Sequence, residues 1–164
     1  MRTMPWVLRT HRALHDALLV PANKRTLRQR WLIRFRMNRL SQVISKRYGG
    51  MVSPMATLGD NINFGHDLHG VFIAGEAVIG DNVTIYHHVT IGSAVTRGEY
   101  PHDAPRIGNN AFIGANATII GRCNIGEGAR IGAGVTLIDT DVAPGEIIVD
   151  KGAYSLTRRE FVRR

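Results

Sequence analysis

Residues 107–137 read IGNNAF-IGANAT-IIGRCN-IGEGAR-IGAGVT-L, so that an aliphatic residue returns at every sixth position. The same spacing extends back towards the N-terminus with two interruptions. Eight of the residues that begin a hexad are followed directly by glycine. A period of six fits neither an α-helix nor a β-hairpin. The hexads begin at thirteen residues: Val52, Leu58, Phe64, Ile73, Ile79, Ile85, Ile91, Ile107, Ile113, Ile119, Ile125, Ile131 and Leu137.

This period is typical of a parallel β-helix. Each hexad supplies one short strand and one corner, and three hexads close a roughly triangular coil. The first residue of a hexad points inward and stacks on its counterpart in the next coil, about 4.8 Å away. Glycine is expected where the corners need unusual backbone dihedrals. Because stacked coils bury one continuous aliphatic core, we predict a mainly β fold over residues 51–150.

Charge divides the chain into two unlike parts. Residues 1–50 hold twelve Lys or Arg and one acid, a net charge of +11, whereas residues 51–164 hold nine and twelve, a net charge of −3. The length of 164 residues fits one domain with an appendage. Cys123, the only cysteine, excludes an internal disulfide and suits a reducing compartment. It lies at a small inward position, where packing is its expected role.

Residues 1–50 are predicted to form a basic α-helical segment, with helices at about 5–20 and 23–47. Pro21 ends the first helix, and Gly49 and Gly50 end the second. The apolar coverage is broad, so the pair should pack on the first coil or on a neighbouring subunit. The arginines form a solvated face or contact an anionic surface such as membrane lipid or an acidic polymer. Nucleic acid is not expected, because no recognition motif accompanies the charge.

The sequence also bears on location. No apolar run approaches the roughly 18 residues that a membrane span needs. Charges interrupt the N-terminus too early for the core of a signal peptide. We therefore expect a cytoplasmic protein that is at most peripheral at the inner face of the membrane.

Two interruptions break the repeat. Phe64 and Ile73 are nine residues apart, so three extra residues should bulge near Gly70. Ile91 and Ile107 are sixteen residues apart, which predicts an extruded loop at about 93–106. Loops that interrupt a regular solenoid usually carry function. A last strand at 147–149 should close the stack, followed by a basic tail at 151–164.

Five of the seven histidines lie at or beside these interruptions: His66, His69, His87, His88 and His102. His66 and His87 both take the third, outward-facing position of a hexad. They are 21 residues apart, which is one coil of 18 plus the bulge of three, so they should stack at the same corner.

Two chemistries could use such a cluster. A neutral imidazole can act as a general base towards a hydroxyl, with Asp67 or Asp103 orienting the ring. Three histidines can instead hold zinc, as in the β-helical carbonic anhydrases. That family, which resembles this chain in its hexads, places two of its histidines five residues apart, and no pair here has this spacing. We therefore expect no metal requirement.

Several segments resemble the serine acetyltransferases among the hexapeptide-repeat acyltransferases. The resemblance runs from about Leu40 to Val149 and is carried by AVIGDNVTIYHHVTIG (77–92), PRIGNNAFIGANATIIG (105–121) and IGAGVTL (131–137). It implies a left-handed β-helix, an exception to the usual right-handed crossover. It also implies a homotrimer with active sites between subunits, trimers that can pair, and acetyl-CoA as the acetyl donor.

The resemblance also implies site residues. His66, in GHDLHG (65–70), matches the general base, with Asp67 assisting it. His102 is the nearest match to a second histidine in the extruded loop, and His87 and His88 would shape the acceptor pocket. The coenzyme positions map onto Gly92, Ala115, Ala133 and Gly134.

The chain departs from the family pattern at three places. Ala104 precedes Pro105 where the family has histidine, and DKGAY (150–154) stands where many relatives have GVPAR. Only about fifty residues precede the coils, whereas full serine acetyltransferases carry a long helical domain there. In this respect the chain also resembles the short exopolysaccharide acetyltransferases of the colanic-acid type. The expected acceptor is therefore L-serine or a serine-like molecule, the alternative is a sugar or polysaccharide hydroxyl, and a third possibility is a non-catalytic scaffold.

Overall fold

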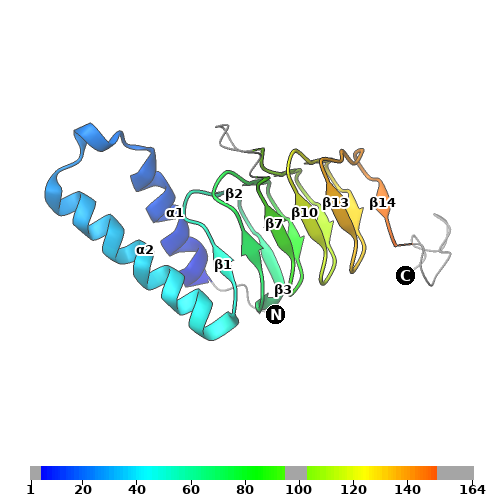
Figure 1. Ribbon diagram of the computed structural model, residues 1–164, viewed down its shortest axis with the longest axis horizontal. Coiled ribbons are helices and arrows are strands. Elements are labelled where there is room, and N and C mark those ends of the chain that lie inside the picture. Colours follow the sequence, from blue (N-terminus) through cyan, green and yellow to red (C-terminus); the bar gives the residue numbers. More distant parts are fainter. Residues whose placement is uncertain (1–4, 95–102, 151–164) are drawn as a thin grey trace.

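The computed structural model describes residues 5–94 and 103–150. A helical hairpin leads into a stack of coils that runs along the long axis of the molecule (Figure 1). The hairpin consists of α1 (Pro5–Leu19), a short 3₁₀ turn (Ala22–Lys24) and α2 (Leu27–Tyr48). No helix in this part of the chain is both long and apolar enough to cross a membrane.

The second helix begins four residues later than expected. Thr26 accepts a hydrogen bond from the Gln29 amide at 3.2 Å, and the Gln29 side chain accepts one from the Thr26 amide at 2.9 Å. This capping box sets the start of α2 at Leu27. Gly49, with φ 63°, ends the helix as predicted.

The coils contain three strands each, and equivalent strands form three sheets. The first sheet contains β1 (Met51–Val52), β4 (Phe72–Ile73), β7 (Thr90–Gly92), β10 (Thr118–Ile120) and β13 (Thr136–Ile138). The second sheet contains β2 (Thr57–Leu58), β5 (Val78–Ile79), β8 (Arg106–Ile107) and β11 (Asn124–Ile125). The third sheet contains β3 (Asn63–Leu68), β6 (Thr84–Ile85), β9 (Phe112–Ile113), β12 (Arg130–Ile131) and β14 (Ile147–Ile148).

Apart from β14, which pairs with β12, every strand pairs in parallel with the strand three places away in sequence, one coil above or below. The predicted parallel β-helix is therefore confirmed. Twelve of the thirteen residues that begin a hexad are buried, and Leu58 is half-buried against the same core. Burying each Ile side chain contributes about 1.5–3 kcal/mol, so the ladder is the main stabilising feature of the coils.

The glycines that follow the first residue have a different role from the one expected. Their φ angles are not left-handed; a Cβ on Gly108, for example, would lie 2.7 Å from the Glu127 backbone nitrogen in the next coil. Glycine is needed there because adjacent backbones approach closely. Left-handed φ falls instead on the fourth position of the hexad, where Asn tolerates it. Asn occupies this position in four hexads: Asn61, Asn82, Asn110 and Asn116.

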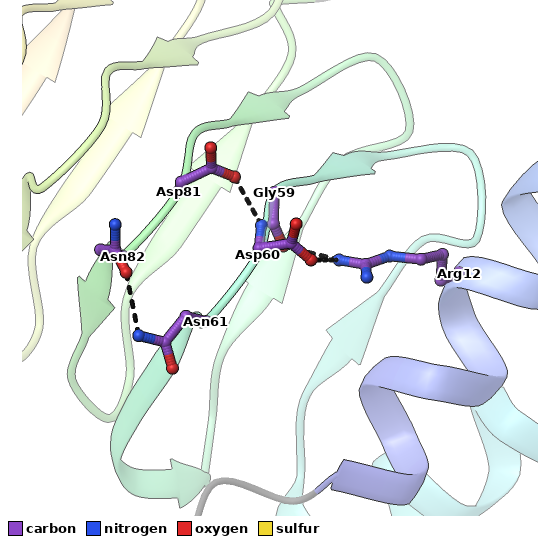
Figure 2. Close-up of polar contacts among 6 residues, drawn as sticks. All are labelled: Arg12, Gly59, Asp60, Asn61, Asp81 and Asn82. Atoms are coloured by element: carbon purple, nitrogen blue, oxygen red, sulfur yellow. Dashed lines mark hydrogen bonds and ion pairs between the residues drawn. The ribbon is translucent and has the colours of Figure 1, made fainter.

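The helical hairpin is fixed to the first coil by polar contacts. His11 is buried, and its Nε2 donates a hydrogen bond to the Ser53 carbonyl at 2.8 Å. Arg12 forms an ion pair with Asp60 at 2.6 Å and donates to the Gly59 carbonyl at 3.1 Å (Figure 2). The Asp60 amide in turn donates to Asp81 of the next coil at 2.6 Å. The hairpin therefore packs on the first coil, one of the two partners predicted for it.

Candidate active site

One corner of the β-helix carries the histidines. It lies where the chain leaves the third sheet for the first sheet, after β3, β6, β9 and β12, and we call it the histidine corner. The coils are in register here, with Phe64 beside Ile85, Ile85 beside Ile113, and Ile113 beside Ile131. The third positions of four hexads therefore form one outward-facing column along this corner: His66, His87, Ala115 and Ala133.

The predicted juxtaposition of His66 and His87 is confirmed. Their ring centroids are 4.9 Å apart, and the ring planes meet at 83°. The His88 ring lies 5.4 Å from the His87 ring. His66 is exposed and His87 is half-buried, so the pair forms a shallow imidazole surface that a small polar substrate can reach.

Tyr86 is a member of this cluster that the sequence reasoning missed. Its ring centroid is 5.4 Å from that of His66 and 5.3 Å from that of Phe112. A Cβ on Gly65 would lie 3.1 Å from the Tyr86 ring, so the tyrosine covers a glycine. The signal was present in the sequence, because Tyr86 stands at a second position where most hexads have glycine. The Tyr86 ring forms one side of the surface around the His66 ring.

Asp67 and His88 both take the left-handed conformation at the fourth position, with φ 54° and 57°. Neither residue is Asn or Gly. In other residues this backbone conformation is strained, and such strain is often found at functional sites. Within the described chain, no hydrogen bond joins Asp67 to His66. The Nδ1 atom of His87 is buried and has no hydrogen-bond partner there either. A buried polar atom without a hydrogen-bond partner is uncommon in a folded protein.

The remaining histidines are not part of the column. The ring of His69 packs edge-on against Tyr48 of α2, with centroids 5.3 Å apart. Its carbonyl accepts the His88 amide at 2.8 Å, which links the histidine corner to α2. His102 lies outside the described residues. Among the residues that are described, no group of three or more His, Cys, Asp or Glu side chains could hold a metal ion.

Three of the four predicted coenzyme positions share the histidine corner. Ala115 and Ala133 continue the column beyond His87, and the Gly134 amide donates to the Ala115 carbonyl at 2.8 Å. Their small side chains leave the outer backbone of two coils accessible. Gly92 is not with them, because it ends β7 in the first sheet and leads to the next corner. The segment predicted to form an extruded loop begins near that corner; its residues 95–102 lie outside the described part of the chain, and the Ala94 amide donates to the Asp103 carbonyl at 2.9 Å.

Comparisons with known proteins agree with this fold. Residues 104–139 match the family described as bacterial transferase hexapeptide (six repeats). A serine acetyltransferase of Mycobacterium tuberculosis is 38% identical over 98 residues, which cover 60% of this chain and 41% of that protein. A serine acetyltransferase of Helicobacter pylori is 34% identical over 119 residues, which cover 73% of this chain and 67% of that protein.

Among solved structures, soybean serine acetyltransferase complexed with serine superimposes with a TM-score of 0.71 at 36% identity, covering 90% of this chain and 55% of the soybean chain. This similarity supports the left-handed β-helix that the family resemblance implied, with its two N-terminal helices. The chain spans about two fifths of the M. tuberculosis relative and about half of the soybean enzyme. Since it covers two thirds of the H. pylori protein at this level of identity, the chain belongs to the serine acetyltransferase family of hexapeptide-repeat proteins.

Proposed function

We propose that this chain is an acetyl-CoA-dependent O-acetyltransferase of the serine O-acetyltransferase type, with L-serine or a closely similar small molecule as acceptor. The observation that carries the proposal is the column at the histidine corner. A pair of outward-facing imidazoles, His66 and His87, is followed along the same edge by two alanines. A proton acceptor therefore lies next to an accessible backbone surface on which the extended arm of the acetyl donor can lie.

The residues fit the acetyl donor. Ala115 and Ala133 expose their backbone at the corner, and any larger side chain there would stand in the path of an extended ligand. The Gly134 carbonyl and the Ala133 amide appear in none of the ladder hydrogen bonds between described residues. A backbone group without a ladder partner can bind an amide group of a pantetheine arm.

His66 is the group that takes the proton in this proposal. As the acceptor oxygen bonds to the thioester carbonyl carbon, His66 removes the hydroxyl proton, and it returns a proton to the sulfur when the C–S bond breaks. The protons balance, and no metal or covalent enzyme intermediate is needed. His87, whose ring centroid is 4.9 Å from that of His66, can donate a hydrogen bond from its ring to the oxygen that gains negative charge.

A homotrimer completes this proposal. Gly92 lies one corner away from Ala115 and Ala133, so a single chain does not gather all four coenzyme positions. A subunit packed against the histidine corner brings its own next corner close, and with it a second Gly92. Light scattering of the purified protein measures the mass directly, and a monomer at assay concentration contradicts this step.

The test of the function is thiol release from acetyl-CoA, measured with and without L-serine. His66→Ala should lower turnover at least about 100-fold, the usual scale for loss of a general base. His69→Ala is the matched control, because this histidine packs on Tyr48 outside the column and should keep most activity. Turnover of His66→Ala near that of the wild type would refute the assignment. If the protein binds CoA but releases no thiol from acetyl-CoA in the presence of L-serine, sugar hydroxyls should be tested as acceptors instead.

A further inference from the structure

An exposed aromatic stripe runs along the outer face of α2. It consists of Leu27, Trp31 and Phe35, which are spaced four residues apart and so share one side of the helix. They are 82%, 66% and 46% exposed, and the rings of Trp31 and Phe35 stack with centroids 5.5 Å apart. Large apolar side chains grouped in this way on a surface mark an interaction site.

The stripe is not the face that holds the hairpin in place. A second apolar stripe of α2 packs against α1 and the first coil, with Leu40 and Ile44 buried and Ile33 and Met37 half-buried. The helix therefore has enough apolar contact without Leu27, Trp31 and Phe35. Their exposure needs a separate explanation.

Two exposed aliphatic side chains lie at the turn of the hairpin. Leu19 and Val20 are exposed at the end of α1, close in sequence to the start of α2 at Leu27. Arg25 ties this turn together by donating to the carbonyls of Leu18 and Val20. In Figure 1 the turn between α1 and α2 projects away from the coils. The apolar surface is thus presented at an end of the molecule that the β-helix does not cover.

Basic side chains border the stripe. Arg28 and Arg34 lie three residues before and after Trp31, and Arg39 lies four after Phe35, so all three are neighbours of the aromatic pair on the helix surface. All three are exposed. Helix α2 contains seven Lys or Arg and no Asp or Glu, and residues 5–48 contain eleven against one acid, Asp16.

The combination of an apolar stripe with bordering arginines indicates which kind of partner binds this surface. Two copies of the stripe placed face to face would bring these arginines together without an acid to pair with, which opposes a symmetric contact. An acidic polymer would satisfy the charge but would offer no apolar phase to Leu19, Val20 and Leu27. An anionic bilayer satisfies both, because aromatic and aliphatic side chains enter the acyl boundary while Lys and Arg meet the head groups.

We propose that the α1–α2 hairpin docks on bilayers containing anionic phospholipid, with Leu27, Trp31 and Phe35 lying in the membrane interface. The contact is peripheral and reversible. It needs neither the histidine corner nor turnover, so this proposal and the proposed function can fail separately.

The test is sedimentation of the protein with vesicles of phosphatidylcholine alone or mixed in equal parts with phosphatidylglycerol. Binding should require phosphatidylglycerol and weaken with salt, and each Arg→Gln change at Arg28, Arg34 or Arg39 should lower the partition coefficient about fivefold. Trp31→Ala combined with Phe35→Ala should lower it at least about tenfold. Phe72→Ala, at an exposed aromatic residue of β4, is the matched control and should bind like the wild type.

Tryptophan fluorescence locates the stripe directly. In a Trp6→Phe background Trp31 is the only tryptophan, and its emission should shift to the blue with the anionic vesicles. Three results would overturn the proposal. The first is no sedimentation with anionic vesicles at low salt, and the second is unchanged binding of the Trp31 and Phe35 double variant. The third is equal binding to a soluble polyanion and to vesicles, without a blue shift of the Trp31 emission. A fourth result would assign the stripe to a second copy of the chain. In that case the wild type would self-associate without binding vesicles, and the Trp31 and Phe35 double variant would no longer self-associate.

Discussion

Replacing Gly108 with alanine should destabilise the β-helix without touching its core or the histidine corner. A Cβ at this position would lie 2.7 Å from the Glu127 nitrogen and 2.9 Å from the Ile125 carbonyl oxygen. An ordinary contact needs about 3.4 Å, so the two coils must part locally by about 0.7 Å. Both obstructing atoms belong to the backbone, and no side-chain rotation can relieve the contact.

The expected magnitude follows from the hydrogen bonds at this corner. The Gly108 amide donates to the Ile125 carbonyl at 2.7 Å, and the Gly128 amide donates to the Asn109 carbonyl at 2.8 Å. Overpacking costs about 1–3 kcal/mol, and each ladder bond that weakens forfeits part of about 0.5–1.5 kcal/mol. We therefore expect a loss of about 2–4 kcal/mol. For a chain of this size 3 kcal/mol lowers the melting temperature by about 6–12 °C.

Gly92→Ala is the matched control, because it also replaces a glycine that follows the first residue of a hexad. The nearest atom to its added Cβ is Cγ1 of Ile120 at 3.5 Å, an ordinary contact. Its stability should stay within about 0.5 kcal/mol of the wild type, since a less flexible unfolded chain offsets small strain. Urea unfolding of both variants at equal protein concentration measures the difference. Equal stability of the two variants would refute the explanation of these glycines by close approach of the coils.

Three further changes test other parts of the structure by urea unfolding. Ile113→Ala should cost about 2–5 kcal/mol because the side chain is fully buried, whereas Ile138→Ala, 58% exposed, should change stability by less than about 0.5 kcal/mol. Burial lowers the pKa of His11 from 6.5 despite its hydrogen bond, so the folded state binds fewer protons than the unfolded state. Stability should therefore be level above pH 6.5 and fall as the pH drops below it, and His11→Gln should flatten this fall; an unchanged slope would contradict the role of His11. Thr26→Ala removes the capping box and should cost about 1 kcal/mol, and no loss would show that α2 does not depend on its cap.

The fold was predictable because a solenoid is almost one-dimensional. Once the first positions of the hexads are aligned, parallel pairing and register follow for every coil, and the extra three residues before Gly70 enter the count as a bulge. The start of α2 was less predictable, because residues that precede Thr26 could also have taken the N-cap position. The two apolar stripes of α2 were also visible in the sequence. Which of them is buried depends on contacts with α1 and the first coil that no periodicity contains.

The positions of the site residues along the coils could be predicted from their spacing in the sequence. The packing and orientation of their side chains could not. The 21-residue spacing placed His66 beside His87, and the same count separates Gly92, which ends a first-sheet strand, from Ala115, which follows a third-sheet strand. Tyr86 was overlooked because aromatic residues are common in β proteins, and only its place at a glycine position distinguishes it. The orientation of Asp67 could not be read from sequence, because it follows from the left-handed turn at that corner.

The histidine corner also shows how a regular solenoid acquires a site. The third position of a hexad faces outward, so His66 and His87 replace residues that the core never contacts, and the ladder of isoleucines beneath them is unaffected. The coil repeat then places equivalent positions side by side, which sets the 4.9 Å separation of the two rings without any dedicated support. The cost falls on the fourth position instead, where Asp67 and His88 take a backbone conformation that Asn or Gly adopts in other hexads. Restoring Asn at His88 should therefore stabilise the fold, and any loss of activity in that variant would measure what the ring itself contributes.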